Sequence, residues 1–263
     1  MKFAFIADVH IGPSGFYKGV RRKMTEFSEL YIFNFVRQLG PDYDFAINLG
    51  DLIQDDEEQR DVANYKKGLE LFGQAQIPVY HLVGNHDTVN IQQEQLENLL
   101  EQKQLYYSFD VSDIHFIVLY SKVYSGEKSI IDKKQKDWLI KDLEKTDKPT
   151  MVFSHHSLAG QILFGNPWFQ GEPEACLIEN RKEIRGILFE SQKVIAVLNG
   201  HLHWNNISHH DGIPYISVQS ATENFNNDDI AANAWGVVEI KDNMFKLMVF
   251  GNDPFEYEYE FYI

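Results

Sequence analysis

Five short polar motifs, each directly after an apolar run, constrain the fold of this chain more than any other feature. The runs have the length and composition of buried strands, and each ends at side chains that can coordinate a metal or form hydrogen bonds. The motifs are Asp8-Val9-His10, Gly50-Asp51, Gly84-Asn85-His86-Asp87, His155-His156 and Gly200-His201-Leu202-His203. Because ligands gather at the carboxyl ends of strands in open α/β sheets, we expect these residues to converge.

The rest of the chain alternates strand and helix patterns, which indicates an α/β protein. Helices are predicted at residues 24–39, 55–72, 132–144 and 177–189, with another that Asn90 is expected to cap. Strands are predicted at residues 2–7, 44–49, 77–83, 106–109, 114–120, 150–153, 194–198, 215–218, 235–240 and 245–250. The hairpin formed by 106–109 and 114–120 is expected to belong to a second sheet. No linker or repeat divides the chain, so residues 1–263 are predicted to form a single domain.

The overall charge argues against a polyanionic partner. The chain has 39 acidic and 24 basic residues and a formal net charge of −15, so its field repels nucleic acid. No apolar run approaches the roughly 18 residues that a membrane span needs. With one cysteine, Cys176, no internal disulfide is expected. These observations predict a soluble, cytoplasmic protein that acts on a small molecule.

Two charged segments near the motifs have both a functional and a structural interpretation. The run 55–58 (Asp-Asp-Glu-Glu) has the composition of a metal site, but we interpret it as the acidic first turn of a solvated helix. Tyr17, Lys18, Arg21 and Arg22 follow the first motif and would be able to meet a phosphate. We favour a solvated basic surface for them.

The last strand has a regular alternation. Aromatic residues occupy one face of 255–262 and glutamates the other: Phe255, Tyr257, Tyr259 and Phe261 against Glu256, Glu258 and Glu260. This pattern predicts a half-buried strand. One interpretation is an edge strand whose glutamates discourage pairing. The alternative is a strand at the interface of a homodimer.

The polar residues at the predicted strand ends have the composition of a ligand set for two metal ions. They are Asp8, His10, Asp51, Asn85, His86, His155, His156, His201 and His203. Carboxylate and amide oxygens mixed with imidazole, without a thiolate, suit Mn²⁺, Fe, Zn²⁺ or Co²⁺. A single aspartate can bridge two ions about 3.5 to 4 Å apart, which then clamp the attacking and leaving oxygens of an in-line displacement.

In this order the motifs, which span residues 8–203, resemble the signature of the calcineurin-like metallophosphoesterase superfamily: D-x-H, G-D, G-N-H-D/E, a lone histidine and G-H-x-H. The resemblance implies a four-layer α-β-β-α sandwich, in which two mixed β-sheets are flanked by helices. It also implies two divalent or trivalent metal ions as cofactors.

The resemblance assigns a role to each motif residue. Asp8, His10, Asp51 and His203 would hold one metal, and Asp51 would bridge to a second metal held by Asn85, His155 and His201. His86 would act on the leaving group as general acid or transition-state stabiliser, and Asp87 would orient it. A hydroxide bridging the metals would be the nucleophile.

The fourth motif departs from the His-His-Pro that is frequent in phosphodiesterase-like members, because Ser157 follows His156 here. We take His155 as the ligand because it matches the family position better. His156 is then interpreted as a substrate-binding or packing residue. Trp168, in the long segment 158–173, is a second candidate for substrate binding, since an indole can stack on a base.

Together these features predict a dinuclear-metal-dependent phosphoester hydrolase. It most resembles single-domain bacterial phosphodiesterases, which implies a small nucleotide or glycerophosphodiester substrate. A phosphomonoesterase or a nucleotide pyrophosphatase is the alternative, since the fold alone does not choose among them. A nuclease is disfavoured by the acidic charge. A non-catalytic binding scaffold is disfavoured because the ligand set has no substitution.

Overall fold

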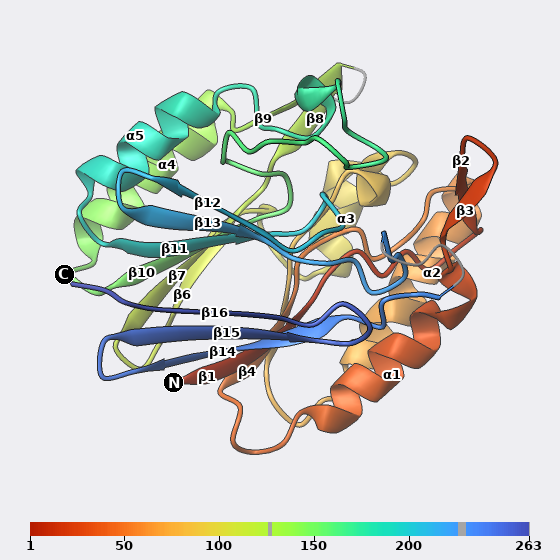
Figure 1. Cartoon of the computed structure of the whole chain (residues 1–263), viewed down its shortest axis with the longest axis horizontal. Helices are drawn as coiled ribbons and strands as arrows, with labels where there is room; N and C mark the ends of the chain where they lie inside the picture. Colours follow the sequence, from red (N-terminus) through yellow and green to blue (C-terminus); the bar gives the residue numbers. More distant parts are fainter. Residues whose placement is uncertain (126–127, 226–229, 263) are drawn as a thin grey trace.

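The computed structural model describes residues 1–125, 128–225 and 230–262. Two six-stranded mixed sheets lie face to face, with helices on their outer sides (Figure 1). The strand orders are β16-β15-β14-β1-β4-β5 and β12-β13-β11-β10-β7-β6. The predicted fold class is therefore confirmed.

The first sheet joins both ends of the chain. Its strands are β1 (Lys2–Ile6), β4 (Phe45–Asn48), β5 (Val79–His81), β14 (Trp235–Lys241), β15 (Met244–Phe250) and β16 (Phe255–Glu260). β1, β4 and β5 are parallel, whereas β14 pairs antiparallel with β1. The parallel strands therefore end at the same edge, where the first three motifs follow them.

The second sheet supplies the last two motifs. Its strands are β6 (Tyr107–Val111), β7 (Ile114–Leu119), β10 (Thr150–Ser154), β11 (Val194–Asn199), β12 (Asn206–His210) and β13 (Ile213–Ser217). β7, β10, β11 and β13 are parallel, and β6 and β12 are antiparallel edges. The predicted hairpin is β6–β7, and it belongs to this second sheet as expected.

Helices cover both outer faces. Around the first sheet lie α1 (Ser28–Gln38), α2 (Glu58–Phe72) and α3 (Gln93–Leu99), and outside the second lie α4 (Lys133–Lys145) and α5 (Arg181–Glu190) (Figure 1). The short 3₁₀ turns are η1 (Thr25–Phe27), η2 (His86–Thr88) and η3 (Pro173–Ala175). Two small hairpins, β2 (Gly15–Tyr17) with β3 (Val20–Lys23) and β8 (Lys122–Ser125) with β9 (Lys128–Ile130), lie outside the sandwich. No helix in the described ranges is long and apolar enough to cross a membrane.

The core between the sheets is built on aromatic rings. Phe3 stacks on Phe45 with ring centroids 4.7 Å apart, and it meets Phe153 of the other sheet edge-on at 5.7 Å. All three side chains are buried. Burying such a side chain stabilises a fold by about 1.5 to 3 kcal/mol, so this packing holds the strand ends in a fixed relation.

Several helices begin later than predicted: α1 begins at Ser28 and α2 at Glu58, and tertiary contacts explain two further cases. The helix expected from residue 177 begins at Arg181, because Leu177 and Ile178 are buried in the preceding loop and the Ile178 N–H bonds to the Ser157 carbonyl at 3.1 Å. Asn90 does not cap α3: its side chain donates to Asp61 at 2.9 Å, and α3 begins at Gln93. In both cases tertiary contacts use residues that the local pattern assigned to a helix.

The C-terminal strand β16 is an edge strand of the first sheet, paired with β15. Its aromatic face packs against the core between the sheets, and its glutamates are exposed, so the predicted alternation is confirmed. Tyr257 also contacts the other sheet, with its Oη 2.8 Å from Nε2 of His209 on β12. The homodimer stays a prediction.

Candidate metal centre

The motif residues meet where the carboxyl ends of β1, β4 and β5 face those of β10 and β11. Buried side chains form two groups, in each of which the potential ligand atoms lie within 4.8 Å of one another. The groups are Asp8, His10, Asp51 and His203, and Asp51, His155 and His201. Asp51 belongs to both, so its carboxylate lies between two potential metal positions.

In the first group the ring nitrogens and carboxylates point toward a common centre. The Nε2 atoms of His10 and His203 are 3.2 Å apart. Nε2 of His203 lies 3.6 Å from Oδ1 of Asp8, and Nε2 of His10 lies 3.9 Å from Oδ2 of Asp51. Potential ligand atoms that converge in this way fit one metal ion between them.

The second group has the same character. Nε2 of His155 lies 3.3 Å from Oδ2 of Asp51 and 3.1 Å from Oδ1 of Asn85. The opposite ring nitrogen of His155 is 2.9 Å from the Leu49 carbonyl, which favours a proton on Nδ1 and leaves Nε2 for a metal. The ring of His201 lies 5.0 Å from that of His155.

One orphaned atom tests whether metals fit. Oδ2 of Asp51 is buried and has no hydrogen-bond partner among the described residues, although it lies between both groups. Leaving a buried carboxylate oxygen unsatisfied is costly, and a cation removes that cost. Oxygen and imidazole donors match the ions that the sequence predicts, so the residues fit a dinuclear centre that shares Asp51.

The backbone at this site is strained. Several potential ligands have left-handed φ angles: Asp8 (52°), His10 (55°), Asp51 (49°), His201 (64°) and His203 (55°). Such conformations cost on the order of 1 to 3 kcal/mol each and persist where the surrounding structure imposes them, which is characteristic of functional sites.

Two motif glycines allow the loops to approach each other. A Cβ on Gly84 would lie 2.1 Å from Oδ1 of Asp51, and one on Gly50 would lie 2.5 Å from Nδ1 of His155. Gly50 also has a φ of +97°. Any side chain at either position would displace a potential ligand, so glycine is needed for close approach as well as for turning the chain.

Burial and mutual charge shift the pKa values of these groups in opposite directions. Burial raises the pKa of Asp51, but the charges of His155 and His86 outweigh it and hold that pKa well below its usual range. Burial lowers the pKa of His155 and of His203, whereas neighbouring carboxylates raise both to about 9. Burial depresses the pKa of His201 well below its usual value.

His86 stands beside the two groups and contacts Lys23, which the sequence did not single out, and Asp55, which was assigned to a helix. Its Nδ1 faces the Asp55 carboxylate, and its Nε2 lies 2.9 Å from Nζ of Lys23. Its backbone N–H donates to Oδ1 of Asp51 at 2.9 Å. Asp55 precedes α2, which starts at Glu58, so the interpretation of Asp55 as part of a helical first turn is wrong.

Asp87 does not contact the His86 ring, contrary to the orienting role expected of it. Its carboxylate accepts hydrogen bonds from the backbone N–H of Ile53 (3.1 Å) and of Gly84 (2.8 Å). Burial raises its pKa to about 7. Asp87 therefore ties the second motif loop to the third, and Asp55 takes the place expected for it beside His86.

The two predicted substrate-binding residues lie on either side of the centre. Nδ1 of His156 is 2.7 Å from Oγ of Ser121, and its buried Nε2 has no partner among the described residues. Trp168 donates through Nε1 to both carboxylate oxygens of Glu223, at 2.9 and 2.8 Å. The ring of Tyr17 lies 4.8 Å from that of Trp168, so one side of the indole is already occupied.

Glu223 is a further site residue that sequence reasoning missed. Its carboxylate contacts Nδ1 of His203 and is fully buried. A carboxylate on the far nitrogen of a ligating histidine fixes the ring and increases its basicity. Glu223 follows the last motif by twenty residues. The only sequence signal is an acidic residue in a polar, non-periodic segment, which is too common to identify a site.

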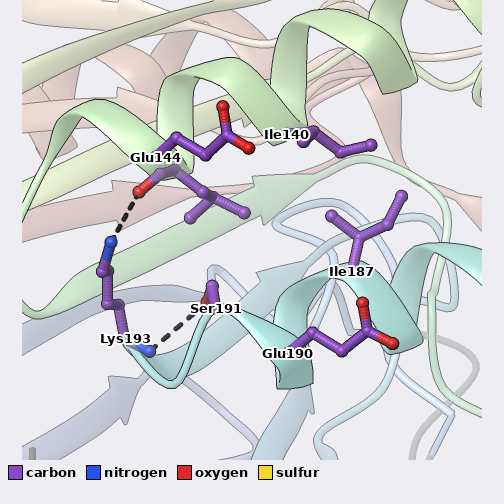
Figure 2. A pocket seen from close by; sticks show the side chains of 7 residues that line it. Ile140, Glu144, Ile187, Glu190, Ser191 and Lys193 are labelled. Carbon is purple, nitrogen blue, oxygen red and sulfur yellow. Dashed lines mark hydrogen bonds between the residues drawn. The ribbon is translucent and has the colours of Figure 1, made fainter.

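A cavity of about 280 Å³ opens beside the second group. Polar and apolar side chains share its wall: Asp55, Asn85, His86, His156 and His201 with Val89, Val123, Phe169 and Ala175. A different hollow of about 320 Å³ lies between α4 and α5, with Ile140 and Ile187 facing each other and glutamates at its rim (Figure 2). It contains no predicted site residue, so the cavity at the metal centre is the candidate substrate site.

Solved structures of low sequence identity share the fold. A dimetal phosphatase from Danio rerio superposes with a TM-score of 0.78 at 16% identity, covering 97% of this chain and 98% of the other. GAP50, the anchor in the inner membrane complex of Plasmodium, superposes with a TM-score of 0.64 at 13% identity, covering 99% of this chain and 88% of the other. A purple acid phosphatase from seeds of yellow lupin (Lupinus luteus) superposes with a TM-score of 0.63 at 12% identity, covering 97% of this chain and 53% of the other. At such identities the likeness concerns the fold alone.

Sequence comparison identifies the family. No curated protein sequence matches the chain. Residues 1–205 match the family described as calcineurin-like phosphoesterase, a stretch that contains all five motifs. This chain therefore belongs to the calcineurin-like phosphoesterase family.

Proposed function

We propose that this metal-dependent phosphoester hydrolase is a phosphodiesterase that acts on a small nucleotide or a glycerophosphodiester. The observation that carries the proposal is the cavity of about 280 Å³ beside Asn85, His86 and His201. Its volume is near the lower end of ligand pockets, which suits a small substrate better than a polymer.

The wall of this cavity is divided in a way that supports a diester. Asn85, His86 and His201 lie on the metal side, whereas Val89, Val123 and Phe169 provide apolar surface. A diester carries an organic group on each side of the phosphorus, and the apolar surface offers one of them a place. His156 lines this cavity, and its Nε2, which has no partner among the described residues, would donate to a substrate oxygen when that nitrogen carries the proton.

When bound, the metal ions supply Lewis acidity that activates water and neutralises charge on the phosphoryl group. The chain supplies the rest. Asp8, His10, Asp51 and His203 would hold one ion, and Asp51, Asn85, His155 and His201 the other. Asp55 holds a proton on Nδ1 of His86, which leaves Nε2 of His86 directed toward Lys23 and the leaving-group side.

The test is hydrolysis of bis(p-nitrophenyl) phosphate with Mn²⁺, compared with p-nitrophenyl phosphate. We expect diester hydrolysis in the wild-type enzyme and its loss in Asp51→Ala. A panel of cyclic nucleotides, glycerophosphodiesters and ADP-ribose then defines the substrate class. Efficient hydrolysis of the monoester without the diester would replace the diesterase by a phosphomonoesterase. Fewer than about one metal per chain after reconstitution, with no esterase activity, would support the non-catalytic scaffold instead.

A further inference from the structure

Lys23 is a buried lysine without a counter-ion. Its side chain is 4% exposed, although lysine is almost never fully buried unless it is paired. Nζ contacts Oε1 of Gln54 at 3.0 Å and Nε2 of His86 at 2.9 Å. Both acceptors are uncharged when the His86 ring is neutral. No carboxylate in the described part of the chain forms an ion pair with Lys23.

The surroundings place this ammonium beside the candidate metal centre. The carboxylates that act on its charge from a distance include Asp51, Asp8 and Glu223, which belong to the metal centre or contact it. Its ammonium lies 5.4 Å from the centre of the Trp168 ring. The charge of Lys23 therefore lies among groups that face the metal positions, on the side of His86 and Trp168.

The chain fixes Lys23 in this position. Lys23 ends β3, and the next residue, Met24, donates its backbone N–H to the Thr222 carbonyl at 3.0 Å. The aliphatic stem packs against Gly15 of β2, where a Cβ would lie 3.1 Å from it. The hairpin β2–β3 thus holds the Lys23 side chain in place beside the centre. An ammonium has three N–H donors, and Gln54 and His86 accept two of them.

We propose that Lys23 is a substrate-binding residue whose third N–H donates to a non-bridging oxygen of the substrate's phosphoryl group. Bound metal ions would engage the charges of Asp8 and Asp51, whereas Glu223 and Asp55 already contact His203 and His86, so no carboxylate would be left to pair directly with the Lys23 ammonium. A phosphoryl oxygen supplies that anion with a charge-assisted hydrogen bond. The inference rests on the proposed phosphoester chemistry of this site, whichever ester class is the substrate.

The experiment measures binding of inorganic phosphate to Mn²⁺-reconstituted protein by isothermal titration calorimetry. Lys23→Met removes the charge and keeps the length of the stem. It is expected to weaken phosphate binding by about tenfold to hundredfold, with metal content unchanged and thermal stability equal or higher, since a buried charge is removed. Lys18→Met is the matched control: it makes the same charge change in the same hairpin at an exposed position, and it should bind phosphate like the wild type. Lys23→Arg should bind phosphate with an affinity between that of Lys23→Met and that of the wild type.

Two outcomes would overturn the proposal. One is wild-type phosphate affinity in Lys23→Met with both metals bound. The other is loss of metals or a lower melting temperature in Lys23→Met, which would assign Lys23 to holding the site together. The proposed ester class is tested separately, by the hydrolysis assays. If the enzyme hydrolyses no diester, Lys23→Met can still weaken phosphate binding and so support the role of Lys23. If the enzyme is a diesterase, Lys23→Met can still bind phosphate like the wild type and so refute that role.

Discussion

The molecule has two clusters of histidine and carboxylate, at opposite ends of its strands. The metal centre follows the carboxyl ends of β4, β10 and β11, whereas His115 lies at the start of β7 and pairs in register with Thr150 at the start of β10. Nδ1 of His115 is 2.6 Å from Asp110, and its Nε2 is 3.0 Å from Asp142. Lys148 also bonds to Asp110, at 2.9 Å. We call these four residues the His115 cluster.

The two clusters differ in how completely their polar atoms are hydrogen-bonded and in the strain of their backbone. Every ring nitrogen of the His115 cluster has a carboxylate partner, and none of its four residues has a positive φ. The metal centre has strained ligands and an unpartnered buried oxygen on Asp51. Similar residue types therefore make a fully hydrogen-bonded network at one end and a strained set of potential metal ligands at the other. Backbone strain and a buried oxygen without a hydrogen-bond partner among the described residues, more than composition, mark the candidate site.

The largest expected effect comes from the residue that both metal groups share. Asp51→Ala should lose metal from both positions and reduce diester hydrolysis on the order of a thousandfold or more. Metal content by mass spectrometry and hydrolysis of bis(p-nitrophenyl) phosphate measure the two effects. The matched change in the other cluster, Asp142→Ala, should keep metals and activity. An active, metal-replete Asp51→Ala enzyme would refute the shared ligand.

Neighbouring residues of the third motif should separate chemistry from metal binding. His86→Ala is expected to keep both metals and to reduce the turnover rate about 10²- to 10⁴-fold, because it removes the imidazole proposed to act on the leaving group. Asn85→Ala should weaken the second metal itself. Parallel kinetics and metal titrations distinguish the two variants. Loss of metal in His86→Ala would contradict this division.

Glu223 gives a smaller effect, because it acts on the metal through His203. Glu223→Gln should weaken metal binding by about 10- to 100-fold, since the far nitrogen of His203 loses its carboxylate. Competition with a chelator measures the affinity. Unchanged affinity would mean that the His203 ring is oriented by packing alone.

The smallest effect belongs to the His115 cluster and appears only in stability. Burial lowers the pKa of His115, but its hydrogen bonds to Asp142 and Asp110 outweigh burial and raise it. Because the folded-state pKa is raised, the stabilisation is present below the unfolded value of about 6.5 and is lost as pH rises through the folded-state pKa. Relative to His115→Asn, the wild type should be more stable near pH 6 by less than about 1 kcal/mol, with the difference shrinking by pH 8. Thermal unfolding across this range checks it, and a difference that grows with pH would contradict it.

Sequence reasoning recovered what local pattern encodes. A polar motif directly after an apolar run is visible without a structure, so the residues of the two groups that the structure brings together, from Asp8 to His203, all belong to the predicted ligand set. Lys23, Asp55 and Glu223 were missed because their roles depend on how a hairpin and two loops fold over the strand ends. Asp55 resembled a helical first turn because acidic residues are favoured there for an unrelated electrostatic reason. Asp87 was placed in the right motif, but its backbone partners in another loop are a tertiary feature.

The most direct test is a crystal structure of the protein soaked with Mn²⁺, with an anomalous difference map. We expect two peaks about 3.5 to 4 Å apart on either side of the Asp51 carboxylate, and none at the His115 cluster. A single peak, an empty centre or a peak beside His115 would contradict the claim that this chain holds a dinuclear metal centre bridged by Asp51.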